Sequence, residues 1–174
     1  MRTYAAFLRG INLGPAKKVP MAELRALAEQ LGYADVATYI NSGNLVFSAT
    51  AKPARLEQQL STALRERFGF SVDVCVRSRE RLAGLLAANP FPEGDPSKVT
   101  IAFLTKAVAP GVEERLAAKA APDEPFAVLE SEIWVHYGRG LGTSELAAKF
   151  PAVVGVSATV RNVRTVEKVF GLMS

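Results

Sequence analysis

The chain has 174 residues, of which 49% are hydrophobic, and it carries 21 lysines and arginines against 17 aspartates and glutamates. This length suits one domain or two small subdomains, and the net charge of +4 favours anionic partners without demanding them. The single cysteine, Cys75, excludes an internal disulfide and a multi-cysteine metal site. No apolar run approaches a signal-peptide core or the roughly 20 residues of a membrane span, so we expect a cytoplasmic protein without membrane association.

The first part of the chain predicts the element order strand, helix, strand, strand, helix, strand. Tyr4–Leu8 is an apolar run typical of a strand covered on both faces, and leucines at helical spacing follow in residues 21–31. Two short strands in residues 36–47 flank a polar turn, and Pro53 opens a second helix. Val72–Arg77 alternates as a strand with one buried face does. This order is that of a split βαβ, ferredoxin-like unit.

The second part of the chain partly repeats this element order without repeating the sequence. Ser78 is placed to cap a third helix, and residues 89–96 contain three prolines, which makes them the best boundary. Beyond it we expect strands at 99–104, 126–129, 133–137 and 156–160, a helix opened by Pro110, a helix at 144–150 and a closing helix. The prediction is an α+β fold of two ferredoxin-like subdomains packed together, the second divergent: residues 1–77, a helix and proline-rich connection at 78–96, and residues 97–174 with the C-terminal helix.

A basic, glycine-punctuated loop lies between the first strand and the first helix. Its glycines permit backbone N–H groups to converge on an anion, and its basic side chains supply positive charge. The residues that would act in this way are Arg9, Gly10, Asn12, Lys17 and Lys18. The loop is not a P-loop, because the glycine gap is one residue short and Pro15 removes a donor. A solvated connecting loop is the alternative interpretation.

Two other polar stretches are candidates for the same ligand. The tetrad Asn41-Ser42-Gly43-Asn44 offers amides and a hydroxyl, although the same residues are also typical of a turn chosen for its backbone conformation. Near the end of the chain, Arg161, Arg164 and Lys168 have the spacing of one helical face. Such a cationic strip suits a phosphate backbone, and it equally suits a solvated outer face.

The remaining motifs are weaker. Gly138–Ser144 lies between a predicted strand and helix, but it fails the dinucleotide-binding pattern, so Ser144 is predicted to be a helix cap. The only histidine, His136, and the only cysteine, Cys75, have no partner in the sequence that would complete a metal site or a catalytic dyad. We therefore predict no metal and no cofactor, and we assign no catalytic residue.

Three stretches together resemble a known family. They are Leu8–Asn12 with Val19–Leu24, then Thr38–Phe47, then Arg161-Asn162 before Thr165-Val166. This combination is similar to the bacterial family catalogued as domain of unknown function 1697. The resemblance implies paired α+β units of ferredoxin-like character and no established activity, cofactor or catalytic residue. It also implies recurrent polar positions, which here are Arg9, Gly10, Asn12, Ser42, Gly43, Asn44, Ser144, Arg161 and Asn162.

This chain departs from the resemblance at two positions. Glu145 stands where members often carry a lysine, which weakens an anion site at the Gly138–Ser144 loop. Val163 stands where members often carry a tryptophan, which removes an aromatic ring that could stack on a base.

The leading functional hypothesis is a protein that binds an anion, either nucleic acid or a phosphorylated metabolite, in a basic polar cleft. The predicted ligand-binding residues are Arg9, Gly10, Asn12, Lys17, Lys18, Asn41, Ser42, Gly43, Asn44, Arg161 and Asn162. Two alternatives stay open: an enzyme acting on a small phosphorylated substrate, and a protein-interaction module whose polar motifs are structural. The sequence leaves the oligomeric state open.

Overall fold

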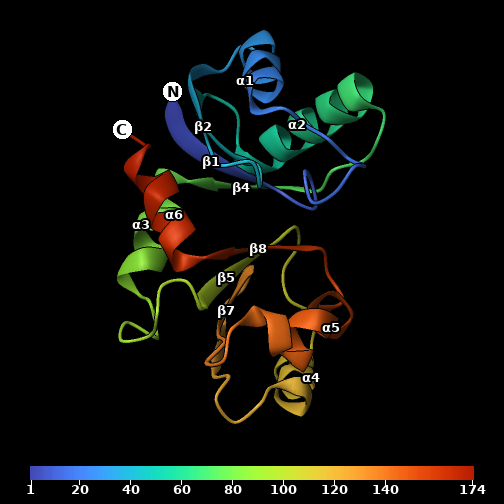
Figure 1. Ribbon diagram of the computed structural model, residues 1–174. Helices are drawn as coiled ribbons and strands as arrows, with labels where there is room; N and C mark the ends of the chain where they lie inside the picture. The colour runs from blue at the N-terminus through green and yellow to red at the C-terminus, as the bar shows by residue number, and fades with distance from the viewer. The chain divides into compact units, whose positions relative to one another are not determined.

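The computed structural model describes residues 1–174 and divides into two compact units (Figure 1). Unit 1 comprises Met1–Ala87 and Glu167–Ser174, and unit 2 comprises Ala88–Val166. Each unit contains a four-stranded sheet in which every paired strand is antiparallel to its neighbour. The prediction of an α+β fold is therefore confirmed. No helix combines the length and hydropathy that a membrane span requires.

Unit 1 has the strand order β2-β3-β1-β4. Its elements are β1 (Arg2–Leu8), α1 (Met21–Gln30), β2 (Ala34–Tyr39), β3 (Asn44–Ala49), α2 (Pro53–Phe68), β4 (Val74–Ser78) and α3 (Arg79–Ala87). The predicted hairpin is confirmed, because β2 and β3 pair antiparallel across the polar turn. Helix α2 ends at Gly69, whose φ of 81° closes the last turn in the left-handed conformation that glycine adopts easily.

The core of unit 1 lies between its sheet and the helices α1 and α2, which Figure 1 shows on the same side of the sheet. Leucines spaced along one stripe of each helix are buried because that spacing keeps them on one face. They are Leu24 and Leu27 of α1 and Leu56, Leu60 and Leu64 of α2. The side chains of Tyr4, Ala6 and Leu8 of β1 complete this core.

The opposite face of the same sheet is also covered. Ala5 and Phe7 of β1 are fully buried, as expected for a strand covered on both faces. Cys75 of β4 is likewise 0% exposed, so the prediction that β4 has only one buried face is wrong. Helix α3 packs against both β1 and β4. Because a strand covered on both faces buries all of its side chains, its exposure does not alternate as it does in a strand with one open face.

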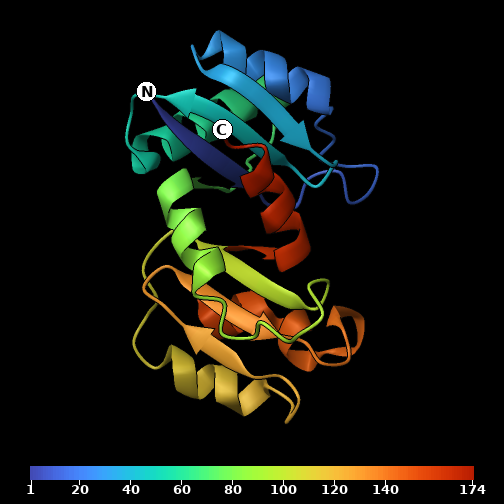
Figure 2. The ribbon, with the colours of Figure 1, turned by 90° about the vertical axis from the view of Figure 1, so that its left-hand side faces the viewer.

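The C-terminal residues of the chain complete unit 1. Figures 1 and 2 both show α6 (Val163–Gly171) beside α3. The guanidinium carbon of Arg79 lies 4.8 Å from the centre of the Phe170 ring, and Arg79 Nε donates to the carbonyl oxygen of Met173 at 2.8 Å. Met173 is itself only 2% exposed, so these last residues are part of a packed structure.

Unit 2 has the strand order β6-β7-β5-β8. Its elements are β5 (Val99–Leu104), α4 (Val112–Lys119), β6 (Phe126–Val128), β7 (Glu132–His136), the 3-10 turn η1 (Leu141–Thr143), α5 (Glu145–Val154) and β8 (Ala158–Asn162), which leads into α6. Its core joins one face of β5 and β7 to Leu116 of α4 and to Leu146 and Phe150 of α5. The orange α5 and yellow α4 are seen again in Figure 2.

Three elements in unit 2 have a boundary that differs from the predicted one by two or more residues. Helix α4 begins at Val112 after a left-handed Gly111, and not at Pro110. Helix α5 continues through Pro151 because Val153 and Val154 beyond it are buried in the core, and the helix then ends at a left-handed Gly155. The last strand begins and ends two residues later than predicted, because its pairing with β5 extends to Asn162.

The two units match strand by strand. Replacing β1, β2, β3 and β4 with β5, β6, β7 and β8 converts one strand order into the other. In that correspondence Ala6-Phe7-Leu8 of β1 matches Ala102-Phe103-Leu104 of β5. The pairing register agrees as well: Ala6 pairs with Val76 of β4, and Ala102 pairs with Val160 of β8. The sequence alone does not reveal these short identities, because the pairing register is needed to bring them into alignment.

Candidate functional site

The side chain of Asn12 organises the basic loop. Its Nδ2 donates to the carbonyl oxygens of Val19 at 2.9 Å and of Asn41 at 2.8 Å, and its Oδ1 accepts from the Val19 N–H at 2.8 Å. The Asn12 N–H also donates to the Lys17 carbonyl oxygen at 3.0 Å. The loop is therefore closed at its base and tied to the polar turn. We call the two joined segments, residues 9–19 and 40–44, the basic clasp.

Gly43 brings the two segments of the basic clasp into close contact. Its carbonyl oxygen accepts from the Leu8 N–H at 2.9 Å. A Cβ atom at this position would lie 2.7 Å from Ile11 Cδ1 and 2.8 Å from Leu8 Cβ. Its φ of 91° is also one that favours glycine. A glycine is therefore required here for two independent reasons, the closeness of the Ile11 and Leu8 side chains and the positive φ.

Asn44 and Ser42 hold the turn itself. Asn44 is 0% exposed, and its Nδ2 donates to the Tyr39 carbonyl oxygen at 2.9 Å and to Ser42 Oγ at 3.1 Å. Buried amides are costly without such partners, which explains why the side chain is directed back into its own turn. The amide side chains of Asn12 and Asn44 are therefore both engaged in holding the clasp together.

The basic clasp concentrates left-handed backbone. Among residues other than glycine, φ is positive at Asn12 (57°), Lys17 (54°), Asp35 (52°) and Ile40 (51°), and three of these four belong to the clasp. Asparagine tolerates this conformation, but for a β-branched residue such as Ile40 it is an outlier. Strained backbone of this kind clusters at functional sites.

Positive charge is gathered on the loop side of the basic clasp. Arg9 Nη1 lies 3.6 Å from Asp73 Oδ2, and the two side chains are 38% and 50% exposed. Lys17 and Lys18 are exposed, and neither ammonium group makes an ion pair within the structure. No aspartate or glutamate occurs in residues 9–19 or 40–44. The clasp thus presents cations without a compensating acid of its own.

Two apolar side chains on the basic clasp point to solvent, which the sequence did not predict. Leu13 is 84% exposed and Ile40 is 50% exposed. The position of Leu13 between Gly10 and Gly14, outside any helical or strand period, was the signal that it would not join the core.

Arg161 and Asn162 end β8 in unit 2. Arg161 Nη1 donates to the Val160 carbonyl oxygen at 3.0 Å, and Asn162 Oδ1 accepts from the Thr165 N–H at 2.9 Å, which caps α6. Unit 1 repeats this arrangement at the end of β4. There Arg77 Nη1 donates to the Val76 carbonyl oxygen at 3.0 Å, and Ser78 Oγ accepts from the Arg81 N–H at 3.1 Å.

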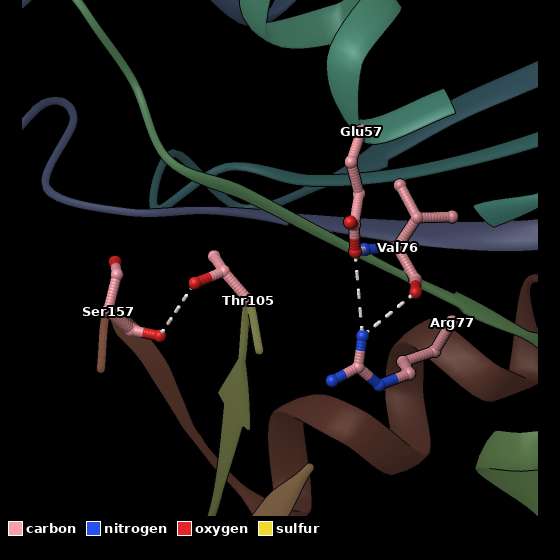
Figure 3. Close-up of polar contacts among 5 residues, drawn as sticks. All are labelled: Glu57, Val76, Arg77, Thr105 and Ser157. Atoms are coloured by element: carbon pink, nitrogen blue, oxygen red, sulfur yellow. Dashed lines mark hydrogen bonds and ion pairs between the residues drawn. The ribbon is translucent and has the colours of Figure 1, made fainter. Parts of the chain in front are cut away.

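Figure 3 shows the unit 1 copy of this strand end with Glu57 of α2. Glu57 Oε1 accepts from the Val76 N–H at 2.9 Å and lies 3.6 Å from Arg77 Nη1. Burial raises the pKa of Glu57 above its ordinary value, although the Val76 hydrogen bond and the Arg77 charge both act to lower that pKa. The same figure shows, in unit 2, Thr105 Oγ1 donating to the Ser157 carbonyl oxygen at 3.5 Å, beside the end of β5.

The candidate residues thus fall into two groups. The structure joins the loop residues Arg9, Gly10, Asn12, Lys17 and Lys18 to the turn residues Asn41, Ser42, Gly43 and Asn44 within unit 1. Arg161 and Asn162 belong to unit 2. The Gly138–Ser144 loop is also in unit 2, where Ser144 Oγ accepts from the Ala147 N–H at 3.0 Å and so caps α5, as predicted.

Comparison with known proteins gives a family and a fold. The family model described as "Protein of unknown function (DUF1697)" matches residues 1–134. A solved structure of a conserved bacterial protein from Streptococcus pneumoniae is similar over 99% of both chains, with 25% sequence identity and a TM-score of 0.77. No curated protein matches the chain. With a family model covering most of its length, the chain belongs to the DUF1697 family.

Proposed function

We propose that the protein binds the phosphate backbone of a nucleic acid through the basic clasp of unit 1. The observation that carries this proposal is a closed loop without acids that presents Lys17 and Lys18 outside any ion pair, with Arg9 on the same loop paired to Asp73. Lysine and arginine contacts to phosphate supply most of the affinity of binding that does not depend on sequence. Such binding needs an exposed basic surface and no stacking aromatic ring.

The amide side chains of the clasp have a different task in this proposal. Asn12 and Asn44 donate their amide hydrogens within the protein, so they hold the loop in place and do not contact the ligand. A loop whose base is closed in this way loses less conformational entropy when it binds. Phosphate contacts would come from the three cationic side chains. Arg161 is kept as a second cationic position, to be tested separately.

Filter binding of labelled single-stranded RNA and duplex DNA over a salt series tests the proposal. Phosphate contacts give an affinity that falls with salt, and each lost contact reduces the slope of log K against log[salt] by about 0.9 on duplex DNA. The double variant Lys17→Ala/Lys18→Ala should therefore bind more weakly and with a smaller slope.

The matched control removes two exposed lysines elsewhere, Lys52→Ala/Lys106→Ala, and should leave the slope unchanged. If the protein binds neither nucleic acid at low salt, or if both double variants lose the same affinity, the proposal is wrong. Saturable protection against heat by a small phosphorylated compound, without nucleic-acid binding, would instead favour the metabolite alternative.

A second candidate function, docking of a partner protein, is favoured by the exposed apolar side chains on the same clasp. Leu13 and Ile40 are both well exposed, and exposed apolar side chains beside positive charge suit an acidic protein surface that has its own apolar centre. Leu13→Ser distinguishes the two functions. It should leave salt-dependent nucleic-acid binding intact, but it should weaken a protein complex that depends on apolar contact.

We also infer that the two units are divergent copies of one ferredoxin-like unit. The shared strand order, the matching Ala-Phe-Leu segments and the repeated arginine-and-cap ends of β4 and β8 support this inference. In this interpretation the basic clasp is specific to the first copy, because unit 2 has Thr105 and Lys106 where unit 1 has Arg9 and Gly10.

A further inference from the structure

Unit 2 contains a polar pocket of about 360 Å³ that is independent of the basic clasp. It lies beside the last residues of α4, the segment that follows them, the Gly138–Ser144 loop and the start of α5. Its charged lining residues are Lys119, Asp123, Glu124, Arg139 and Glu145. Its volume is within the range of sites that hold small molecules.

Glu124 is the most unusual residue of this pocket, because it is a carboxylate with only 6% exposure. Its Oε1 accepts from the Ala121 N–H at 2.8 Å, and it makes no ion pair. Its Oε2 accepts no hydrogen bond, and because no fully buried side-chain oxygen or nitrogen lacks a partner, Oε2 itself is not fully buried. Burial, and then the Glu124 charge, raise the pKa of Tyr137, so the carboxylate also acts on a neighbouring core residue.

The other charged groups of the pocket are already paired. Arg139 Nε lies 3.1 Å from Asp123 Oδ2, and Lys119 Nζ lies 3.5 Å from Glu145 Oε1. Three acids line the pocket against two bases, so the unpaired charge is the one on Glu124. A buried carboxylate with an accessible oxygen and no counter-charge favours a cationic partner.

The backbone around the pocket favours the same sign of charge. The pocket is lined by Ala118–Ala121, where α4 ends, and the carbonyl ends of a helix carry partial negative charge. The start of α5 also lines the pocket and carries the opposite partial charge, but there Ser144 Oγ already accepts from the Ala147 N–H and Glu145 occupies the first turn.

The backbone geometry places Asp123 against the glycine loop. A Cβ atom at Gly138 would lie 2.7 Å from the Asp123 carbonyl oxygen and 3.0 Å from its Oδ2. The glycine therefore allows the acidic segment to lie against the strand end, beside Glu124. A loop whose glycines suggested phosphate binding in the sequence thus lines a carboxylate-rich pocket.

We propose that this pocket binds a small organic cation, a primary ammonium group that donates to Glu124 Oε2. A metal ion fits less well, because the structure contains no cluster of three or more His, Cys, Asp or Glu side chains arranged to hold one. An alkylammonium needs only one or two carboxylate oxygens, and its carbon chain fits a pocket of this volume.

Calorimetric titration of the full-length protein with putrescine, a four-carbon diamine, tests the proposal. 1,4-Butanediol has the same length without charge and should not bind. Glu124→Gln keeps an oxygen that accepts from the Ala121 N–H but removes the charge, so putrescine affinity should fall by about tenfold or more. The matched control Glu130→Gln neutralises an exposed acid outside the pocket and should bind as the wild type does.

A second variant keeps the test decisive if Glu124→Gln does not fold. Glu145→Gln changes an exposed rim residue and releases the Lys119 and Lys149 ammonium groups from their ion pairs, so putrescine should again bind more weakly. The proposal is overturned if the wild type shows no saturable binding of putrescine up to about 10 mM, since the binding free energy would then be smaller than about 3 kcal/mol. It is also overturned if the folded pocket variants bind as tightly as the wild type.

Discussion

The side chain of Asn12 pairs with the backbone of Val19 as a neighbouring strand would, because its amide donates to the Val19 carbonyl and accepts from the Val19 N–H. Val19 is 0% exposed, so neither of these backbone groups has water as a substitute partner. The same amide reaches Asn41 across the clasp. One side chain therefore closes the loop, positions the start of α1 and ties both to the polar turn.

Substitution of Asn12 should destabilise unit 1 strongly. Asn12→Ala removes three side-chain hydrogen bonds, each contributing on the order of 1 kcal/mol, so the free energy of unfolding should fall by about 3 kcal/mol. Asn12→Gly removes the same bonds but accepts the φ of 57° without strain, so it should be the milder change by up to about 1 kcal/mol. Urea denaturation of both variants measures the difference. Wild-type stability in Asn12→Ala would refute the role of the amide.

Gly43→Ala should be among the most damaging single-methyl changes in unit 1. The added carbon would clash with Leu8 and Ile11 in addition to adopting an unfavourable φ, so we expect a loss of about 2–4 kcal/mol. Gly32→Ala is the matched control, because its φ is 86° but no heavy atom lies within 4 Å of the new Cβ. Gly32→Ala should lower the free energy of unfolding by only about 1 kcal/mol. Equal losses in thermal unfolding would show that contact with Leu8 and Ile11 is unimportant.

Glu57 should make the stability of unit 1 depend on pH in the direction opposite to that of most carboxylates. Burial raises the folded pKa of Glu57 above the ordinary value of 4.5. Its contribution to the free energy of unfolding is therefore fully present below the ordinary pKa and is lost as pH rises through the folded pKa. Glu57→Gln keeps an acceptor for the Val76 N–H and does not titrate. In urea denaturation, the free energy of unfolding of the variant minus that of the wild type should therefore be higher at pH 7 than at pH 4. A difference that does not change between these two pH values would contradict the raised pKa.

The cap at Asn162 should be replaceable by a carboxylate. Asn162→Ala leaves the Thr165 N–H without its acceptor and should cost about 1 kcal/mol, whereas Asn162→Asp keeps an acceptor oxygen and adds a favourable charge at the start of α6. Ser78→Ala should show a loss similar to that of Asn162→Ala, because Ser78 accepts from Arg81 in the matching position. Thermal unfolding of the three variants is the measurement, and a destabilised Asn162→Asp would argue against a simple cap.

The leucine spacing of the sequence predicted α1 and α2 because local periodicity determines which helix face is buried. It could not predict the task of Asn12, since the acceptor on Asn41 is 29 positions away and only the fold brings it near. Cys75 was assigned to an open face because the alternation of β4 carries no information about what covers that face.

The unit 2 pocket was beyond prediction for a related reason. Charged residues are almost never fully buried, so a sequence reader assigns Glu124 to the surface by default. Its burial depends on Gly138, which lets the segment before β6 lie against the end of β7. The glycines were visible in the sequence, but the acids that they accommodate lie 14 or more positions earlier in the chain.

The grouping of Glu167–Ser174 with unit 1 bears on the order in which the protein forms during translation. Arg79 cannot donate to the carbonyl oxygen of Met173, nor Thr3 to that of Ser174, until those two residues have been synthesised. The residues of unit 2 are continuous in sequence, so all of them have been synthesised once Val166 has left the ribosome. Unit 1 therefore completes these contacts only after the residues of unit 2 have been synthesised.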